Sequence, residues 1–310
     1  MADMLDLTDR LLICADQRNT RTPLIAKKSL KMGRFLVEID MKFALKSIVA
    51  ATAFVAAGVA GAAAVTFTPA DTYKGLTASG SGALSFSAEL MGALDTGKVL
   101  VTPSGGAIGN ITKDSDGFYT SAAVSASINS LTIDDVTDNV LQAGTVGGAT
   151  QTAAALKSVS SGGVMTVTDL RVDLVNKRVY ANIISTNALN AAGDKTLNNF
   201  YLWDIMGTAQ YDVEGTFTGY DASTAIVGST TVAGPGTYVN SFNGLKITTD
   251  GFTAFSKGLG LLSLGRSALL GVNDFGTVTS TIVAVPEPST YALMGLGLVG
   301  MSLVARRRAK

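Results

Sequence analysis

The 310-residue sequence has no histidine, and its one cysteine is Cys14. Histidine bases, Ser-His-Asp triads and histidine-ligated metal sites are therefore excluded, as are disulfide scaffolds and zinc sites built from cysteines. Charged residues make up only 15% of the chain, in equal numbers of 24 basic and 24 acidic side chains. A neutral chain without a basic stripe is a poor ligand for phosphate backbones, so we expect no nucleic-acid partner.

Residues 41–64 have the three parts of a secretory signal peptide. Two lysines precede an apolar run rich in small residues, and the run ends in an A-x-A pattern. We predict export through the Sec translocon and cleavage by signal peptidase between Ala64 and Val65, with Ala62 as the second small residue of the cleavage site. The alternative is a buried alanine-rich helix.

Residues 1–40 precede this signal and have mixed charge with no export character. We interpret them as a misassigned upstream extension, with Met41 as the true start of the protein. The alternative is a long cytoplasmic leading region or a small independent helix. Under the first interpretation Cys14 is irrelevant, and the exported domain contains neither cysteine nor histidine.

The C-terminal 25 residues combine a proline-rich motif, a run of low polarity over 291–305 and a basic end. Fifteen helical residues span about 22 Å, which is short for a hydrocarbon core of about 30 Å. We predict a transmembrane helix over 291–305 that crosses a thin bilayer, with the arginines on the cytoplasmic side. The motif residues are Pro286, Glu287, Pro288 and Ser289, and the predicted cytoplasmic anchor is Arg306, Arg307 and Arg308.

These three ordered parts resemble the PEP-CTERM sorting signal. The resemblance covers 286–310 and implies a Gram-negative bacterium that makes exopolysaccharide. It also implies recognition by an exosortase, a membrane-embedded processing enzyme. Such a protein is expected to be anchored in the inner membrane before processing and then to reach the cell surface or the extracellular matrix. The alternative is a plain membrane anchor that contains the same tripeptide.

Residues 65–285 carry the alternating polar and apolar pattern of short strands, separated by Gly, Asn and Asp turns. We predict an all-β, sandwich-like antiparallel domain with one or two short helices, near 87–94 and 251–263, flanked by the signal helix and the transmembrane helix. The Gly-, Ser-, Thr- and Ala-rich stretch 142–163 is interpreted as a loop or linker. The clearest strand patterns are 82–88, 164–168, 170–175, 178–184, 211–218 and 276–283.

Two segments of this domain, 162–183 and 245–262, resemble HtaA-type domains, which are extracellular all-β modules linked to haem uptake. The resemblance implies a shared fold. Haem iron is bound by His, Cys, Met or Tyr, and the first two are absent from 65–285. Only Met91, Met165, Met206 or a tyrosine remain as ligands, so we expect no haem and no other cofactor.

Two acidic groups are candidate cation sites. Asp114 and Asp116 stand in a D-x-D-G pattern that is compatible with Ca²⁺, although the loop lacks the later acidic ligand, and a hairpin turn is the alternative. Asp134, Asp135 and Asp138 form a second group that we interpret as a solvated loop. We therefore assign no metal site.

The densest aromatic patch is 200–204. Strand alternation places Tyr201 and Trp203 on one face, where they are candidate contacts for a sugar or a small ligand. The alternative is a buried core strand. The domain's only glutamates are Glu89 and Glu214, and neither belongs to a recognisable pair for glycoside hydrolysis.

These patterns favour a non-enzymatic, structural or adhesive component of the cell surface, exopolysaccharide or biofilm matrix. The second hypothesis is an extracellular binding module for a polysaccharide or small ligand, and the third is a carboxylate-based hydrolase. A binding module predicts aromatic residues in a concavity, and an enzyme predicts two carboxylates that converge in a cleft.

Overall fold

The structure is a computed structural model that describes residues 63–308. The predicted upstream extension 1–40 and the signal peptide as far as Ala62 lie outside the described residues. The helices are α1 (Ala88–Thr96), α2 (Thr249–Gly258), α3 (Ser263–Leu270) and α4 (Pro288–Arg308), with a short 3-10 helix η1 (Ala222–Thr224). The strands are β1 (Ala64–Phe67), β2 (Thr72–Tyr73), β3 (Leu76–Phe86), β4 (Val99–Ser104), β5 (Ile108–Lys113), β6 (Tyr119–Asp134), β7 (Val140–Val146), β8 (Gly148–Leu156), β9 (Ser160–Asp173), β10 (Arg178–Ser185), β11 (Thr196–Ile205), β12 (Thr208–Tyr211), β13 (Phe217–Asp221), β14 (Ile226–Gly228), β15 (Gly236–Phe242), β16 (Leu245–Ile247) and β17 (Gly276–Pro286).

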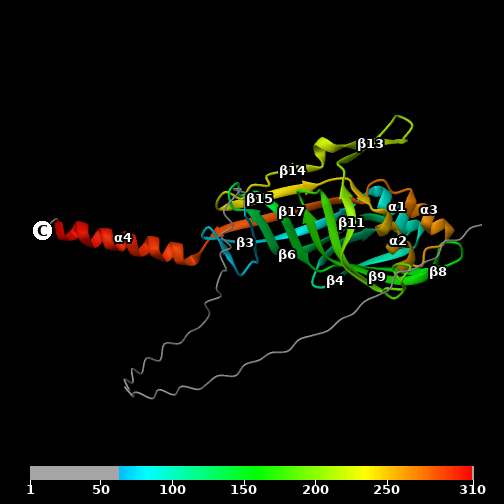
Figure 1. The fold of residues 1–310 in the computed structure, drawn as a ribbon, viewed down its shortest axis with the longest axis horizontal. Coiled ribbons are helices and arrows are strands. Elements are labelled where there is room, and N and C mark those ends of the chain that lie inside the picture. The colour runs from blue at the N-terminus through cyan, green and yellow to red at the C-terminus, as the bar shows by residue number, and fades with distance from the viewer. Residues whose placement is uncertain (1–62, 309–310) are drawn as a thin grey trace, which may run out of the picture. The chain divides into compact units, whose positions relative to one another are not determined.

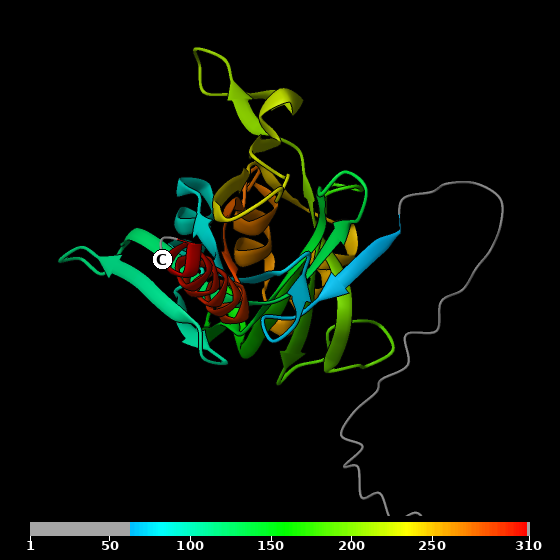
Figure 2. The ribbon, with the colours of Figure 1, turned by 90° about the vertical axis from the view of Figure 1, so that its left-hand side faces the viewer.

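Fifteen of these strands form one antiparallel sheet, whose main path is β14-β15-β17-β3-β6-β7-β9-β10-β11-β16. The predicted all-β antiparallel class is therefore confirmed. β3 and β17 pair from Gly276 opposite Phe86 to Pro286 opposite Leu76, so the first long strand and the last strand lie side by side. The two remaining strands, β12 and β13, form a separate hairpin that projects from the sheet (Figures 1 and 2).

The sheet is rolled, which explains its sandwich-like character. β15 lies next to one end of the path and β16 is the other end, yet only Asn243 and Gly244 separate them in the sequence. The two ends of the sheet must therefore come together at this turn. In the view of Figure 2 the strands curve round, so that the sheet is rolled. Phe242 and Leu245, on either side of the turn, are both buried in the core.

Helices α1, α2 and α3 gather at one end of the rolled sheet (Figure 1). The helix predicted over 87–94 is confirmed as α1, whose N-terminus is capped by the Ser87 side chain. The single helix predicted over 251–263 is instead two helices, α2 and α3. The chain turns between them at Gly260, whose φ of +63° is incompatible with a continuous helix.

Two of the sequence predictions for this domain are wrong. Residues 142–163 are not a loop or linker, because they form most of β7, all of β8 and the start of β9. Small side chains in this stretch face the interior of the sheet, so a composition typical of loops here belongs to strands. The strand predicted over 211–218 contains the turn between β12 and β13, where the Asp212 side chain accepts hydrogen bonds from the backbone N–H groups of Glu214 and Thr216.

The turn that joins β15 to β16 gives a direct test of the rolled topology. Gly244 has a φ of +66°, and a Cβ added there would overlap the backbone carbonyl of Gly207. We predict that Gly244→Ala lowers the free energy of unfolding, measured in urea, by more than about 2 kcal/mol. Gly215 is the matched control, because its φ is +80° but nothing lies within 4 Å of an added Cβ. Equal losses for Gly244→Ala and Gly215→Ala would show that the close approach at Gly244 is unimportant.

Candidate functional site

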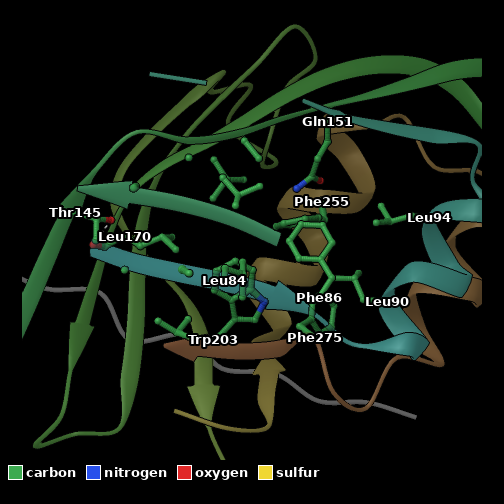
Figure 3. Close-up of a pocket in the computed structure, with 18 of the residues that line it drawn as sticks. Leu84, Phe86, Leu90, Leu94, Thr145, Gln151, Leu170, Trp203, Phe255 and Phe275 are labelled. Atoms are coloured by element: carbon green, nitrogen blue, oxygen red, sulfur yellow. Dashed lines mark hydrogen bonds between the residues drawn. The ribbon is translucent and has the colours of Figure 1, made fainter. Parts of the chain in front are cut away.

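A cavity lies inside the rolled sheet, between the strands and the three clustered helices (Figure 3). Its walls come from strands distant in sequence, including β3, β6, β8, β9 and β17, and from α1, α2 and α3. The centre of a water-sized sphere can reach about 80 Å³ of this space, several times the roughly 10–15 Å³ that one water molecule needs. The cavity is therefore large enough for an organic ligand.

Small residues at inward-facing positions create this space. On β6 the buried side chains alternate with more exposed ones, and Ala126 is buried between Val124 and Ile128. Ala143 on β7 and Ala149 on β8 are likewise buried and line the cavity. Closely packed cores fill such positions with larger aliphatic side chains. The hollow interior is thus encoded by alanines on neighbouring strands.

Three polar atoms in the lining have no hydrogen-bond partner among the side chains and backbone of residues 63–308: Gln151 Oε1, Trp203 Nε1 and Ser280 Oγ. Their residues are 7%, 4% and 4% exposed, respectively. Buried polar groups in native proteins are almost always hydrogen-bonded, and each exception requires an explanation. Three exceptions on the wall of one apolar cavity are buried hydrogen-bonding groups that no described protein atom satisfies.

The structure separates Tyr201 from Trp203, so the prediction that they share a face is wrong. Tyr201 is opposite Tyr180, whereas Trp203 is opposite Val179, and a register shift between these pairs makes Leu202 the additional residue of a β-bulge. The bulge changes the phase of the strand, so that Leu202 and Trp203 are both buried. Trp203 lines the cavity. Its contact with a ligand stays a prediction.

Tyr201 belongs to a separate, partly buried cluster. Its ring lies 5.5 Å from that of Tyr180, and the Arg178 guanidinium is 4.7 Å from its centre. The Tyr201 hydroxyl donates a hydrogen bond to the Asp204 carboxylate. Burial, followed by the hydrogen bond to Asp204 and the negative charge of that carboxylate, raises the pKa of Tyr201 to about 12. Tyr201 is uncharged at neutral pH, and its contact with a ligand stays a prediction.

The cavity does not fit haem. Its lining, within the part of the chain that the structure describes, contains no methionine and no tyrosine. Among the three methionines considered as ligands, Met165 is fully buried in the core, Met91 is partly buried against the core and Met206 is exposed. The lining therefore supplies no side chain that binds haem iron, and no charged side chain for the haem carboxylates.

The predicted acidic candidates stabilise turns. Asp114 accepts hydrogen bonds from the N–H groups of Asp116 and Phe118 and so closes the turn between β5 and β6. Asp134 accepts from Val136 and Thr137, and these backbone donors lower its pKa. Over residues 63–308, no three or more Asp, Glu, His or Cys side chains converge as a metal site.

Two carboxylates that the sequence did not connect lie close together. Glu89, in the first turn of α1, accepts hydrogen bonds from the backbone N–H groups of Asn273 and Asp274. Burial raises the pKa of Asp274, and the negative charge of Glu89 raises it further. These residues are 185 positions apart in the chain, so no local pattern could have predicted their contact. Glu214, by contrast, is exposed at the tip of the β12–β13 hairpin.

The proline-rich motif begins inside the sheet. Pro286 is the last residue of β17 and is opposite Leu76 on β3. The backbone N–H of Glu287 donates a hydrogen bond to the carbonyl of Gly75, at 3.1 Å. The predicted cleavage residues Ala64 and Val65 are also in the sheet, since β1 pairs with β6.

The predicted transmembrane segment 291–305 is confirmed as a helix, which is part of α4, whereas its crossing of a membrane stays a prediction. Its described side chains are exposed, including Arg306 and Arg307. None of the helices among residues 63–308 has an apolar stretch long enough to cross a membrane.

Residues 284–308 match the family model of the PEP-CTERM protein-sorting motif. The chain carries a PEP-CTERM sorting signal. The match includes the proline-rich motif and the helix, as the sequence resemblance predicted. The signal implies an exported protein that is processed by an exosortase and the secretion machinery.

Two solved structures are similar to this chain, and both are of the HtaA type. The haem-binding protein HtaB from Corynebacterium glutamicum is 9% identical, with 72% of this chain and 98% of that chain covered and a TM-score of 0.33. The C-terminal domain of HtaA from the same organism is 10% identical, with coverages of 67% and 99% and a TM-score of 0.30. A likeness this distant carries no argument about ligands. A search of curated protein sequences finds no match.

The position of Asp274 predicts a pH effect on stability. Because its pKa is above the ordinary value of 3.8 in the folded protein, the folded state binds this proton more tightly than the unfolded state. Stability contributed by this group is therefore lost as the pH rises from the ordinary pKa through the folded pKa. We expect Asp274→Asn to be more stable than the wild type at neutral pH, because Asn keeps an oxygen that can accept from the Gly276 N–H.

The measurement is urea unfolding of both proteins across the acidic and neutral range. The difference in stability should increase as the pH rises through that window and then become constant. The exposed Asp116→Asn serves as the control, with a smaller change. A less stable Asp274→Asn protein at neutral pH would contradict the assignment of a raised pKa.

Proposed function

We propose that this protein is an exported, non-catalytic binding protein that holds a small, largely apolar molecule inside its rolled sheet. The observation that supports this most is the cavity, with three unpartnered polar atoms in an otherwise apolar wall. Ligand sites in proteins commonly have this composition, in which apolar surface supplies affinity and a few polar groups orient the ligand.

The absence of converging carboxylates in the lining supports a binding role over a hydrolytic one. In the part of the chain that the structure describes, no Asp or Glu lines the cavity. Glu89 and Asp274 use their carboxylates to hold backbone N–H groups, including that of Gly276. A carboxylate engaged in this way stabilises a loop, which favours the binding role over the hydrolase hypothesis.

A structural or adhesive role at the cell surface or in the exopolysaccharide matrix is the second candidate. It is favoured by the projecting β12–β13 hairpin, where Val213 is 98% exposed. Three aromatic rings cluster on this hairpin: Tyr211 and Phe217 are 5.9 Å apart, and Phe217 and Tyr220 are 4.9 Å apart. A polysaccharide partner would be expected at these rings, and inner-membrane anchoring would precede release to the surface.

Filling the cavity tests the binding proposal. Ala149 on β8 lines the cavity, whereas Ala154 on the same strand is exposed. We predict that Ala149→Leu weakens the binding of N-phenyl-naphthylamine, an uncharged apolar fluorophore, by about tenfold or more. Ala154→Leu should leave the affinity unchanged. The readout is fluorescence titration of the full chain.

A second cavity-filling variant, Ala126→Val on β6, provides an independent test in case Ala149→Leu does not fold. Circular dichroism and urea unfolding establish that each variant is folded before titration. If both folded variants bind the fluorophore as tightly as the wild type, the fluorophore binds elsewhere and the proposed site is wrong.

A further inference from the structure

We infer that the cavity selects an uncharged hydrocarbon chain that carries a carbonyl group, as in an ester, and discriminates against the corresponding carboxylate. This inference rests on the proposed function, because it identifies the chemical class of ligand for the same site. The inference is argued from three features: the absence of charge in the described lining, the hydrogen-bonding character of its unpartnered polar groups, and the packing that holds the Trp203 indole in place.

Among the described residues, the cavity lining contains no charged side chain of either sign. A carboxylate or phosphate inside it would lose its hydration without gaining a cation as partner, and this is among the most unfavourable changes a binding site can impose. The corresponding ester has the same hydrocarbon chain but no charge. Charge alone therefore divides ligands of equal length into those the cavity accepts and those it excludes.

The unpartnered polar atoms define the neutral group. Trp203 Nε1 can only donate a hydrogen bond, and the atom that complements it is an oxygen acceptor such as a carbonyl. The Ser280 hydroxyl can donate to either oxygen of an ester. The unpartnered atom of Gln151 is the acceptor Oε1, so the Gln151 amide can donate to an ester oxygen only through Nε2. Figure 3 shows the Gln151 amide and the Trp203 indole on different strands at the edge of the same space.

The indole is held in place by its neighbours. Its ring centre lies 6.4 Å from that of Phe255 and 6.3 Å from that of Phe275. The two phenylalanine rings are themselves 6.5 Å apart in an edge-to-face arrangement. A three-ring cluster of this kind fixes the direction of the N–H group, because rotation of the indole would displace both phenylalanines. The donor is therefore a preorganised feature of the cavity wall.

The test compares three ligands of equal chain length at neutral pH: methyl octanoate, octyl alcohol and octanoate. Each displaces N-phenyl-naphthylamine from the full-length protein, and displacement gives its affinity. We expect the ester to bind at least about tenfold more tightly than the carboxylate. The alcohol should lie between them, because it is uncharged but has one acceptor oxygen where the ester has two.

The variant Trp203→Phe tests the role of the indole N–H. It keeps an aromatic ring in the cluster and removes only the donor and part of the ring, so the fluorophore should still bind. Affinity for the ester should fall about threefold to tenfold, and the affinity for the carboxylate should change less. Ala154→Leu, on the outer side of β8, is the control.

The outcomes separate this inference from the proposed function. If the protein binds the fluorophore but the carboxylate competes as well as the ester, the inference is wrong and the binding site stands. The same conclusion follows if Trp203→Phe retains the full preference for the ester. If the folded wild-type protein binds neither the fluorophore nor any of the three ligands, the proposed function itself is overturned.

Discussion

The close approach of two turns, at Gly207 and Gly244, is the constraint on which the rolled sheet depends. The backbone N–H of Gly207 donates to the carbonyl of Asn243, and the N–H of Met206 donates to the carbonyl of Gly244. These contacts hold the start of β16 against the end of β11 and bring the two ends of the sheet path together. Without the roll, the inward-facing alanines of β6, β7 and β8 would face solvent and no interior space would exist.

The pairing of β3 with β17 gives the sorting signal a fixed place relative to this sheet. Because Pro286 is both the last residue of β17 and the first residue of the motif, the motif continues directly from the sheet without an intervening linker. The exported domain and its sorting signal therefore share a strand. This arrangement ties the part of the chain that determines sorting to the strand that carries Ser280 in the cavity wall.

Features that depend on consecutive residues could be predicted from the sequence, and features that depend on distant contacts could not. The sorting motif is a pattern of consecutive residues, so the sequence alone identifies it. The alternation of strands such as β10 and β17 likewise predicted the all-β class. The bulge at Leu202, in contrast, is set by pairing with β10, and it reversed the expected orientation of Trp203.

The cavity could not be predicted, because it forms where small side chains on several strands leave the interior of the sheet unfilled. Ala143 and Ala149 belong to the stretch 142–163, which was predicted to be a loop from its composition. Their small side chains leave a cavity only because strands distant in sequence surround them. The contact of Glu89 with Asn273 and Asp274 has the same origin in the fold. The signal that was available in the sequence was the unusual number of alanines and glycines within otherwise strand-like segments.

The central claim is that the interior of the rolled sheet is a ligand site. The most direct test is native mass spectrometry of the protein isolated from the cells that export it, before and after extraction with an organic solvent. The account predicts a mass above that of the processed polypeptide, and the extract should contain an uncharged, largely hydrocarbon compound in a one-to-one ratio with protein. A native mass equal to that of the polypeptide alone, with no such compound in the extract, would contradict it.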